Sequence, residues 1–293
     1  MNRVAVVGPG AIGATFAAAV QATGNADLVL CARRALGQVT VSRDDGAAVP
    51  LTAPVITDPA LVPWPANWVF LAVKAHQVAD AAPWLSALSE PGSVVVVLQN
   101  GVEQRALVEP LVGSGVLVVP AVVWCPAEVA GAGRVRVHGQ PRLCVQAGPP
   151  AVALTALLDG AARVDAVGDF VTEAWRKLCV NAVAGLMVLA GRRAGMFRRA
   201  DVAALARDLA AECVAVGRAE GARFGQAEPN AILEYFSVLP PDQTTSILVD
   251  REAGRPLEWE ARNGVVRRLG ARHGIPTPVS DVVVPLLAAA SEG

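Results

Sequence analysis

Short apolar runs alternate with a helical pattern over the first half of the chain. The runs cover residues 3–7, 28–31, 68–73, 93–98 and 116–123, and an Ala-rich stretch at 12–23 predicts a helix. Strands that are apolar throughout are typical of a parallel sheet with helices on both faces. The first half therefore predicts an α/β domain, to which the short runs 134–139 and 142–148 add antiparallel strands at the sheet edge.

Helical patterns dominate from residue 169 onward. The predicted helices cover residues 170–190, 201–221, 229–237, 244–251, 257–273 and 278–290, and Pro and Gly separate them. The length of 293 residues suits roughly two domains. We expect an α/β domain over residues 1–167 and an all-helical domain over residues 168–293.

The charge balance argues against nucleic acid as a partner. Lys and Arg number 25 against 26 Asp and Glu, which gives a net charge of −1, whereas phosphate binding needs an excess of basic residues. The charge-free run 4–26 contains Pro9 and several glycines, so it predicts neither a signal peptide nor a membrane span. We expect a cytoplasmic protein without a membrane partner.

The cysteines and histidines suggest no metal site. Five cysteines are scattered without CxxC spacing, and the three histidines lie far apart in the sequence. This pattern is typical of reduced core thiols in a cytoplasmic protein.

A glycine motif follows the first predicted strand. Gly8, Gly10 and Gly13 form GxGxxG and open the predicted helix, with Pro9, Ala11 and Ile12 between them. Gly8 permits the tight turn, Gly10 admits a pyrophosphate close to the backbone, and Gly13 lets the helix pack on the strand. In this strand–turn–helix context the motif predicts a Rossmann-type domain that binds a dinucleotide.

The residues after the second predicted strand indicate which dinucleotide binds. An NAD site places an acidic residue there, but this chain has Cys31-Ala32-Arg33-Arg34. A guanidinium suits the 2′-phosphate of NADP. We therefore expect NADPH, with Arg33 as the contact and Arg34 as the alternative; the competing interpretation is a solvated arginine pair.

The chain lacks the catalytic residues that several known dehydrogenase mechanisms require. The single tyrosine, Tyr235, is followed four residues later by Leu239, so the Tyr-x-x-x-Lys pair is absent. A more suitable proton donor is Lys177, which shares a helix face with Asn181 among apolar neighbours. Partial desolvation there favours a lowered lysine pKa and proton donation near neutral pH. Alternatively, the lysine extends to solvent at the helix edge.

These motifs together resemble the ketopantoate reductase (2-dehydropantoate 2-reductase) family over essentially the whole chain. The motifs lie, in family order, at residues 8–13, 72–74, 98–101, 133–139, 172–181 and 245–250, followed by Glu258. The resemblance implies a Rossmann domain, a helical substrate domain and NADPH-dependent reduction of a 2-oxo acid. The expected reaction converts 2-dehydropantoate to pantoate in pantothenate and coenzyme A biosynthesis.

The resemblance also implies two catalytic residues. Lys177 matches the lysine that protonates the substrate carbonyl as hydride arrives, and Glu258 matches the acid that accompanies it. Glu258 has a simpler alternative role, an ion pair with Arg262 one turn further along the helix.

The remaining implied site residues bind cofactor and substrate. Lys74 matches a lysine near the cofactor, and Asn100 matches an asparagine near the nicotinamide ribose and the reacting centre. Asn181 and Ser246 match substrate-binding groups. Taken singly, Ser246 could instead cap a helix, and Asn100-Gly101 could be an ordinary turn.

One position departs from the family pattern. Gly185 stands where pantoate-specific members usually carry a second asparagine on the lysine helix. The missing amide predicts weaker recognition of the substrate hydroxyl, which Gly185→Asn should partly restore. The alternatives are therefore a paralogue for another branched 2-oxo acid, a related hydroxyacid dehydrogenase, or a non-catalytic NADPH sensor. The oligomeric state is open, and a homodimer is one possibility.

Overall fold

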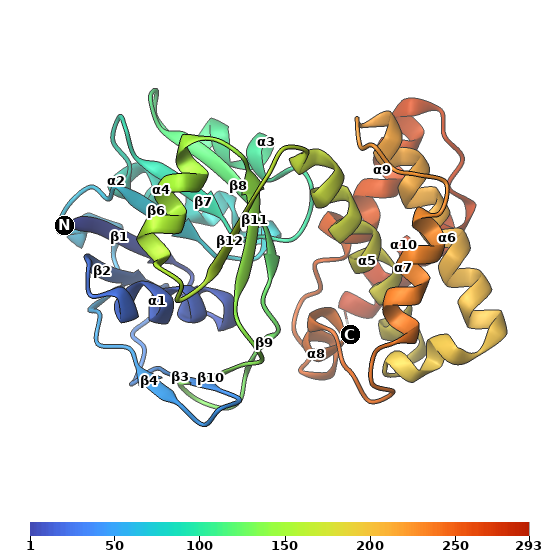
Figure 1. Ribbon diagram of the computed structural model, residues 1–293, viewed down its shortest axis with the longest axis horizontal. Coiled ribbons are helices and arrows are strands. Elements are labelled where there is room, and N and C mark those ends of the chain that lie inside the picture. Colours follow the sequence, from blue (N-terminus) through green and yellow to red (C-terminus); the bar gives the residue numbers. More distant parts are fainter. Residues whose placement is uncertain (293) are drawn as a thin grey trace. The chain divides into compact units, whose positions relative to one another are not determined.

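The computed structural model describes residues 1–292, and the chain divides into two compact units (Figure 1). The first unit comprises residues Met1–Gln99 and Glu103–Phe170. The second joins the short segment Asn100–Val102 to the residues from Val171 onward. The segment that follows the fourth predicted strand is thus assigned to the helical unit, which the sequence did not indicate.

The first unit is built on an eight-stranded sheet with the order β12-β11-β8-β7-β6-β1-β2-β5. The strands are β1 (Asn2–Val7), β2 (Ala26–Cys31), β5 (Val55–Ile56), β6 (Trp68–Leu71), β7 (Val94–Val97), β8 (Leu117–Trp124), β11 (Arg142–Gln146) and β12 (Arg163–Val167). Neighbouring strands are parallel except at β11, which is antiparallel to β8. The predicted Rossmann-type sheet is confirmed.

Both faces of this sheet are buried, which explains why its strands are apolar throughout. Along β1, Val4 and Val6 belong to one buried cluster, whereas Ala5 and Val7 belong to another. The first cluster includes residues of helices α1 (Ala11–Thr23) and α4 (Pro149–Leu158), and the second includes residues of α2 (Ala82–Leu88) and α3 (Gln104–Val108). Short 3-10 turns cover Pro59–Leu61, Ala75–Gln77, Ala79–Ala81 and Glu109–Leu111.

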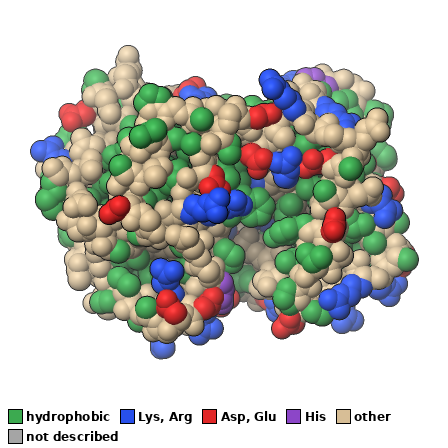
Figure 2. Space-filling model, viewed as in Figure 1, with side chains coloured by type: hydrophobic (Ala, Val, Ile, Leu, Met, Phe, Trp, Pro, Cys, Tyr) green, Lys and Arg blue, Asp and Glu red, His purple; other side chains and the backbone are tan. Residues whose placement is uncertain are grey.

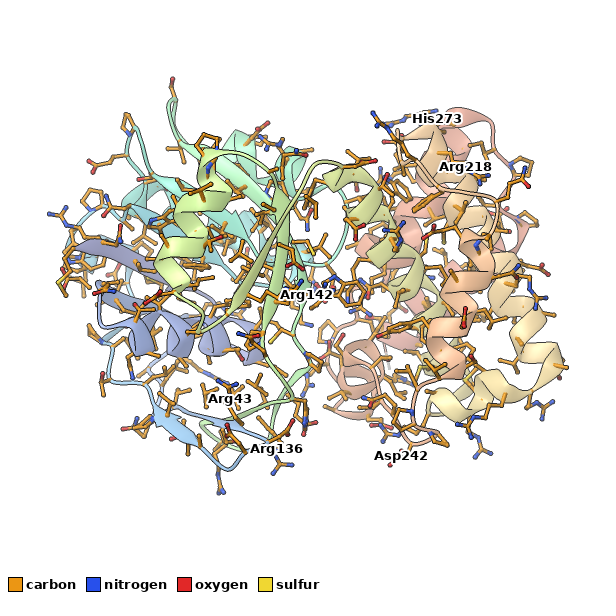
Figure 3. The ribbon with its side chains drawn as sticks, viewed as in Figure 1. Arg43, Arg136, Arg142, Arg218, Asp242 and His273 are labelled. Atoms are coloured by element: carbon orange, nitrogen blue, oxygen red, sulfur yellow. The ribbon has the colours of Figure 1, made fainter. Side chains whose placement is uncertain are left out.

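A second, four-stranded sheet corrects one expectation. Its order is β4-β3-β10-β9, with β3 (Thr40–Arg43), β4 (Ala48–Pro50), β9 (Ala127–Val129) and β10 (Arg134–Val137). The run 142–148 does join the main sheet as antiparallel β11, but β10 pairs with β3 instead. The cause is visible along β10, where exposed arginines alternate with buried valines, a pattern suited to a sheet with one solvent face. Figure 3 shows Arg43 and Arg136 on this small sheet.

The second unit is helical, as predicted. It contains α5 (Phe170–Ala190), α6 (Ala200–Ala219), α7 (Glu228–Ser237), α8 (Ser246–Glu252), α9 (Val265–His273) and α10 (Pro278–Ser291), a 3-10 turn at Ala194–Arg198 and a π turn at Glu260–Gly264. Helix α5 carries the lysine motif, and its residues from Leu178 to Val188 are buried. The helix predicted to begin near residue 257 begins at Trp259 and continues into the π turn Glu260–Gly264, which starts two residues after Glu258. Such turns are frequent at functional sites.

None of the helices within residues 1–292 is both long and apolar enough to cross a bilayer. On the face drawn in Figure 2, basic and acidic side chains are interspersed.

Candidate active site

The glycine loop has the geometry that its motif predicts. Gly8 has a φ of 87°, and a Cβ on it would lie 2.8 Å from Cγ1 of Val73. A Cβ on Gly13 would lie 2.3 Å from the carbonyl oxygen of Gly8. By contrast, a Cβ on Gly10 would meet no described atom within 4 Å. Gly8 and Gly13 are thus required for the turn and its packing, whereas Gly10 leaves space for an incoming group.

The N-terminus of α1 is suited to a phosphate. Gly10 is the N-cap residue, no side chain of the described residues caps the helix, and its first turn carries no acidic residue. Backbone N–H groups at such an end bind anions. Pro9, Ala11 and Ile12 complete the loop and are half-buried. The residues present therefore fit the pyrophosphate of a dinucleotide.

Arg33 and Arg34 lie beside this loop. Strands β1 and β2 pair in parallel with Val7 opposite Cys31, and the N–H of Gly8 donates to the carbonyl of Cys31 at 3.0 Å. Both arginines follow β2 at this edge of the sheet and are exposed.

Lys74 belongs to the same edge. It follows β6, whose Leu71 pairs with Val7 of β1, and it is adjacent to Val73, which contacts the glycine loop. Its backbone N–H donates to Oε1 of Gln77 at 3.2 Å, which anchors the backbone at this point. The glycine loop, Arg33 and Lys74 thus follow three neighbouring parallel strands at the same edge of the sheet.

A chain of polar side chains lies within the second unit. Nδ2 of Asn181, on α5, donates to Oδ1 of Asn100 at 3.1 Å. Nδ2 of Asn100 in turn donates to Oε2 of Glu258 at 3.1 Å. The side chains of Asn181 and Glu258 are buried, at 6% and 5% exposure. Three segments far apart in the sequence thus join in one network, and Asn100 is more than a turn residue.

Lys177 lies one helical turn before Asn181 and is half-buried. The two residues therefore share a face of α5. The neighbouring Arg176 is engaged elsewhere, because its Nε donates to Oε1 of Glu228 at 2.6 Å and it also pairs with Glu173. The hydrogen bond with Glu228 raises the pKa of Arg176 further. Arg176 is therefore held by carboxylates of α5 and α7.

Ser246 has a partner that the sequence did not predict. Its Oγ accepts a hydrogen bond from Nη2 of Arg262 at 2.8 Å. Ser246 is exposed, whereas Arg262 is only 2% exposed. The N-cap of α8 is Thr245, so Ser246 is not the cap residue. The available signal is the spacing of Arg262, four residues after Glu258, but that spacing alone suggests an ion pair with Glu258 and not a bond to Ser246.

Gly185 is packed closely against other residues of the helical unit. A Cβ on it would lie 3.0 Å from Cδ1 of Leu287 and 3.1 Å from Oδ1 of Asn263. Nδ2 of Asn263 donates to the carbonyl of Ala182 at 3.0 Å, and Asn263 is 1% exposed. The amide of Asn263 therefore occupies the space next to the position where the family asparagine would stand.

Comparison with known families agrees with this division of the chain. Residues 4–150 match the model described as ketopantoate reductase PanE/ApbA, and residues 169–291 match the model for the C-terminal part of the same family. Together the two models cover most of the chain.

Similar proteins carry the same description. A 2-dehydropantoate 2-reductase of Mycobacterium tuberculosis is 50% identical over 291 residues, covering 99% of this chain and 98% of that protein. One of Caulobacter vibrioides is 38% identical, covering 99% and 100%.

Solved structures give the same result. A ketopantoate reductase of Ralstonia eutropha is 28% identical, covers 99% of this chain and 98% of its own, and has a TM-score of 0.88. A dimeric ketopantoate reductase of Staphylococcus aureus, at 23% identity with 99% of both chains covered, shares the fold with a TM-score of 0.88. These matches confirm the resemblance drawn from the motifs: the chain belongs to the ketopantoate reductase family.

Proposed function

We propose that this protein reduces 2-dehydropantoate to pantoate with NADPH, a step that serves pantothenate and coenzyme A biosynthesis. The observation that carries the proposal is the buried network in which Asn100 joins Asn181 to Glu258, one helical turn from Lys177. The names of the most similar relatives support the substrate. Their family also implies a nicotinamide cofactor.

The first unit supplies the residues for that cofactor. We assign the pyrophosphate to the loop Gly8–Gly13, the 2′-phosphate to Arg33, and a further cofactor contact to Lys74. An exposed arginine after β2, with no acid in Leu30–Arg34, supports NADPH over NADH. When bound, the nicotinamide supplies the hydride.

The helical unit supplies the proton. As C2 of the substrate accepts the hydride, Nζ of Lys177 donates a proton to the carbonyl oxygen, which becomes the hydroxyl of pantoate. Asn100 is held in one orientation, because its Oδ1 accepts from Asn181 and its Nδ2 donates to Glu258. An asparagine Nδ2 carries two protons, so Asn100 keeps one further proton that can donate to bound substrate or cofactor. We assign substrate binding beside the lysine to Asn181.

A steady-state assay at 340 nm tests the function. The purified protein is given NADPH with ketopantoate, its deoxy analogue 2-oxoisovalerate and pyruvate, and then NADP with the matching hydroxyacids. We expect NADPH consumption with kcat/KM highest for ketopantoate. Preferred oxidation of a hydroxyacid would indicate the related dehydrogenase, and NADPH binding without turnover would indicate a sensor.

Two further points stay predictions. A homodimer, as described for the Staphylococcus aureus protein, is tested by sedimentation equilibrium of the full chain. A cytoplasmic location is tested by fractionation of the native host.

A further inference from the structure

Gln99 is a buried amide that follows the end of β7. It is 4% exposed, and its Nε2 donates to the backbone carbonyl of Val73 at 2.9 Å. A carbonyl can only accept, so the amide nitrogen must face Val73 and Oε1 must face away from it. That oxygen has no hydrogen-bond partner among residues 1–292. A buried acceptor without a partner is costly, so an amide at this position requires a reason.

The Gln99 amide continues the hydrogen bonding between β6 and β7 past the ends of the two strands. The N–H of Leu98 donates to the carbonyl of Leu71 at 2.9 Å, which is a bond between two backbones. One residue later, the side chain of Gln99 reaches the carbonyl of Val73, two residues after the end of β6. The segment that follows β6 is therefore fastened to the end of β7 by a side chain, at the carboxyl edge of the sheet.

A second buried glutamine holds Gln99 in place. Gln104, the first residue of α3, is 3% exposed, and its Nε2 donates to the backbone carbonyl of Gln99 at 2.8 Å. The same nitrogen lies 3.4 Å from the carbonyl oxygen of Ala121 on β8. Gln99 is thus fixed through both its backbone and its side chain, and the two glutamines join the ends of β6 and β7 to β8.

Val73 forms one wall of the glycine loop. A Cβ on Gly8 would lie 2.8 Å from Cγ1 and 3.0 Å from the backbone nitrogen of Val73. A Cβ on Gly13 would lie 3.2 Å from the Cβ of the preceding residue, Ala72. Because the packing is this close, a small movement of Val73 would change the shape of the loop. The bond from Gln99 therefore sets the position of this wall through the carbonyl of Val73.

We propose that Gln99 is a positioning residue for the dinucleotide, which acts through Val73 to hold the glycine loop in the shape that binds the pyrophosphate. In an open parallel sheet a dinucleotide binds at the carboxyl ends of the strands, where this bond lies. An apolar side chain would avoid the unpaired oxygen, but it could not hold the carbonyl of Val73. This inference rests on the proposed function, because it takes NADPH as the cofactor, and it assigns a role to a residue outside the loop.

The test compares the binding of two ligands by isothermal titration calorimetry. One is NADPH, and the other is 2′,5′-ADP, a fragment that carries the 2′-phosphate but lacks the pyrophosphate. Gln99→Met keeps the length of the side chain and removes the donor. The control is Gln146→Met, which removes an exposed glutamine whose Nε2 donates to the carbonyl of Gly168 at 3.4 Å, at the end of β11.

We expect Gln99→Met to raise the Kd for NADPH roughly tenfold, which is the effect of about one hydrogen bond. The Kd for 2′,5′-ADP should stay within about twofold, because this fragment has no pyrophosphate for the loop to bind. The control variant should bind both ligands as wild type does.

Equal weakening of both ligands, or a lower Tm with an unchanged Kd for NADPH, would show a merely structural glutamine and overturn the proposal. If Gln99→Met fails to fold, Gln99→Asn decides, because its amide is one methylene too short to reach Val73 in the same backbone conformation. An unchanged Kd for NADPH in that variant would refute the proposal.

These measurements separate the inference from the proposed function, because neither Kd depends on turnover. If wild type binds NADPH but reduces no 2-oxo acid, the proposed reaction fails, and the two Kd values still decide the role of Gln99. If wild type reduces ketopantoate and Gln99→Met binds NADPH as tightly as wild type, the inference alone fails. If wild type does not bind NADPH, both fail.

Discussion

Replacing Gly185 by Asn tests whether this position recognises substrate or fills space. From the sequence, the new amide restores a contact to the substrate hydroxyl. The structure changes this expectation, because a Cβ at 185 already meets Leu287 at 3.0 Å and Asn263 at 3.1 Å. The rest of an asparagine side chain adds more atoms to a buried part of α5. Leu287 and Asn263 would both have to move.

The expected cost follows from these contacts. Overpacking a buried site typically costs about 1–3 kcal/mol. Displacing Asn263 from the carbonyl of Ala182 adds about 0.5–1.5 kcal/mol when that bond is lost. Replacing a helical glycine returns only about 0.3 kcal/mol. We therefore expect Gly185→Asn to lower the free energy of unfolding by roughly 1–4 kcal/mol, or the Tm by roughly 2–16 °C.

Thermal unfolding measures the expected loss of stability, and steady-state kinetics measure whether the new amide restores a contact to the substrate hydroxyl. The control is Ala190→Asn, which makes a comparable change at the exposed end of the same helix. We expect a lower Tm for Gly185→Asn alone and no gain in preference for ketopantoate over 2-oxoisovalerate. A Tm at or above that of wild type would refute the packing argument, because the new amide would then satisfy Oδ1 of Asn263, which has no partner within the described residues.

Three further variants have defined outcomes. Lys177→Ala should lower kcat by at least about 100-fold while the Kd for NADPH is retained; near-normal turnover would remove Lys177 as proton donor. Arg33→Ala should narrow the preference for NADPH over NADH more than Arg34→Ala does, and equal binding of both cofactors by wild type would contradict the assignment. Glu212→Gln should lower the free energy of unfolding by about 1–3 kcal/mol, because this buried carboxylate accepts the backbone N–H and the hydroxyl of Ser280; an unchanged denaturant midpoint would argue against it.

The main elements could be predicted because their signals are local. Helix α5 has the predicted bounds of 170 and 190, since its apolar run is long and glycine follows it. The strands β1, β6 and β7 were found because burial on both faces makes them apolar throughout. These elements can be predicted because buried positions are mostly apolar, so the pattern of apolar residues along the sequence shows which positions are buried.

The run 134–139 was predicted to join the wrong sheet because strand pairing is not local. The residues of β10 alternate in burial, so a strand was predictable, but its parallel partner β3 is far away in the sequence. The alternation of exposed and buried residues along a strand shows which face meets solvent, but it does not determine which strand pairs with it. Strand β12 was not predicted for a different reason. Its residues are exposed or half-buried, so its apolar pattern is weak.

The candidate site shows the same limit at the level of side chains. Asn100, Asn181 and Glu258 were identified by family resemblance, but only the structure shows that Asn100 bridges the other two. Helical spacing, which would put Arg262 one turn after Glu258, also offered an ion pair between the two as the alternative role of Glu258. The π turn changes the local geometry between them, and Arg262 donates to Ser246 instead.

Polar side chains that are buried in the helical unit have no explanation in hydrophobic patterning. Four such side chains are each less than a tenth exposed: Asn181, Glu258, Arg262 and Asn263. Each takes a buried position that an apolar side chain could fill. Burying such groups is costly unless partners compensate, yet Nε of Arg262 and Oδ1 of Asn263 have none within residues 1–292. A fold selected for stability alone would replace them with apolar residues. Their retention calls for a role other than packing, which agrees with the polar active site that membership of the ketopantoate reductase family implies.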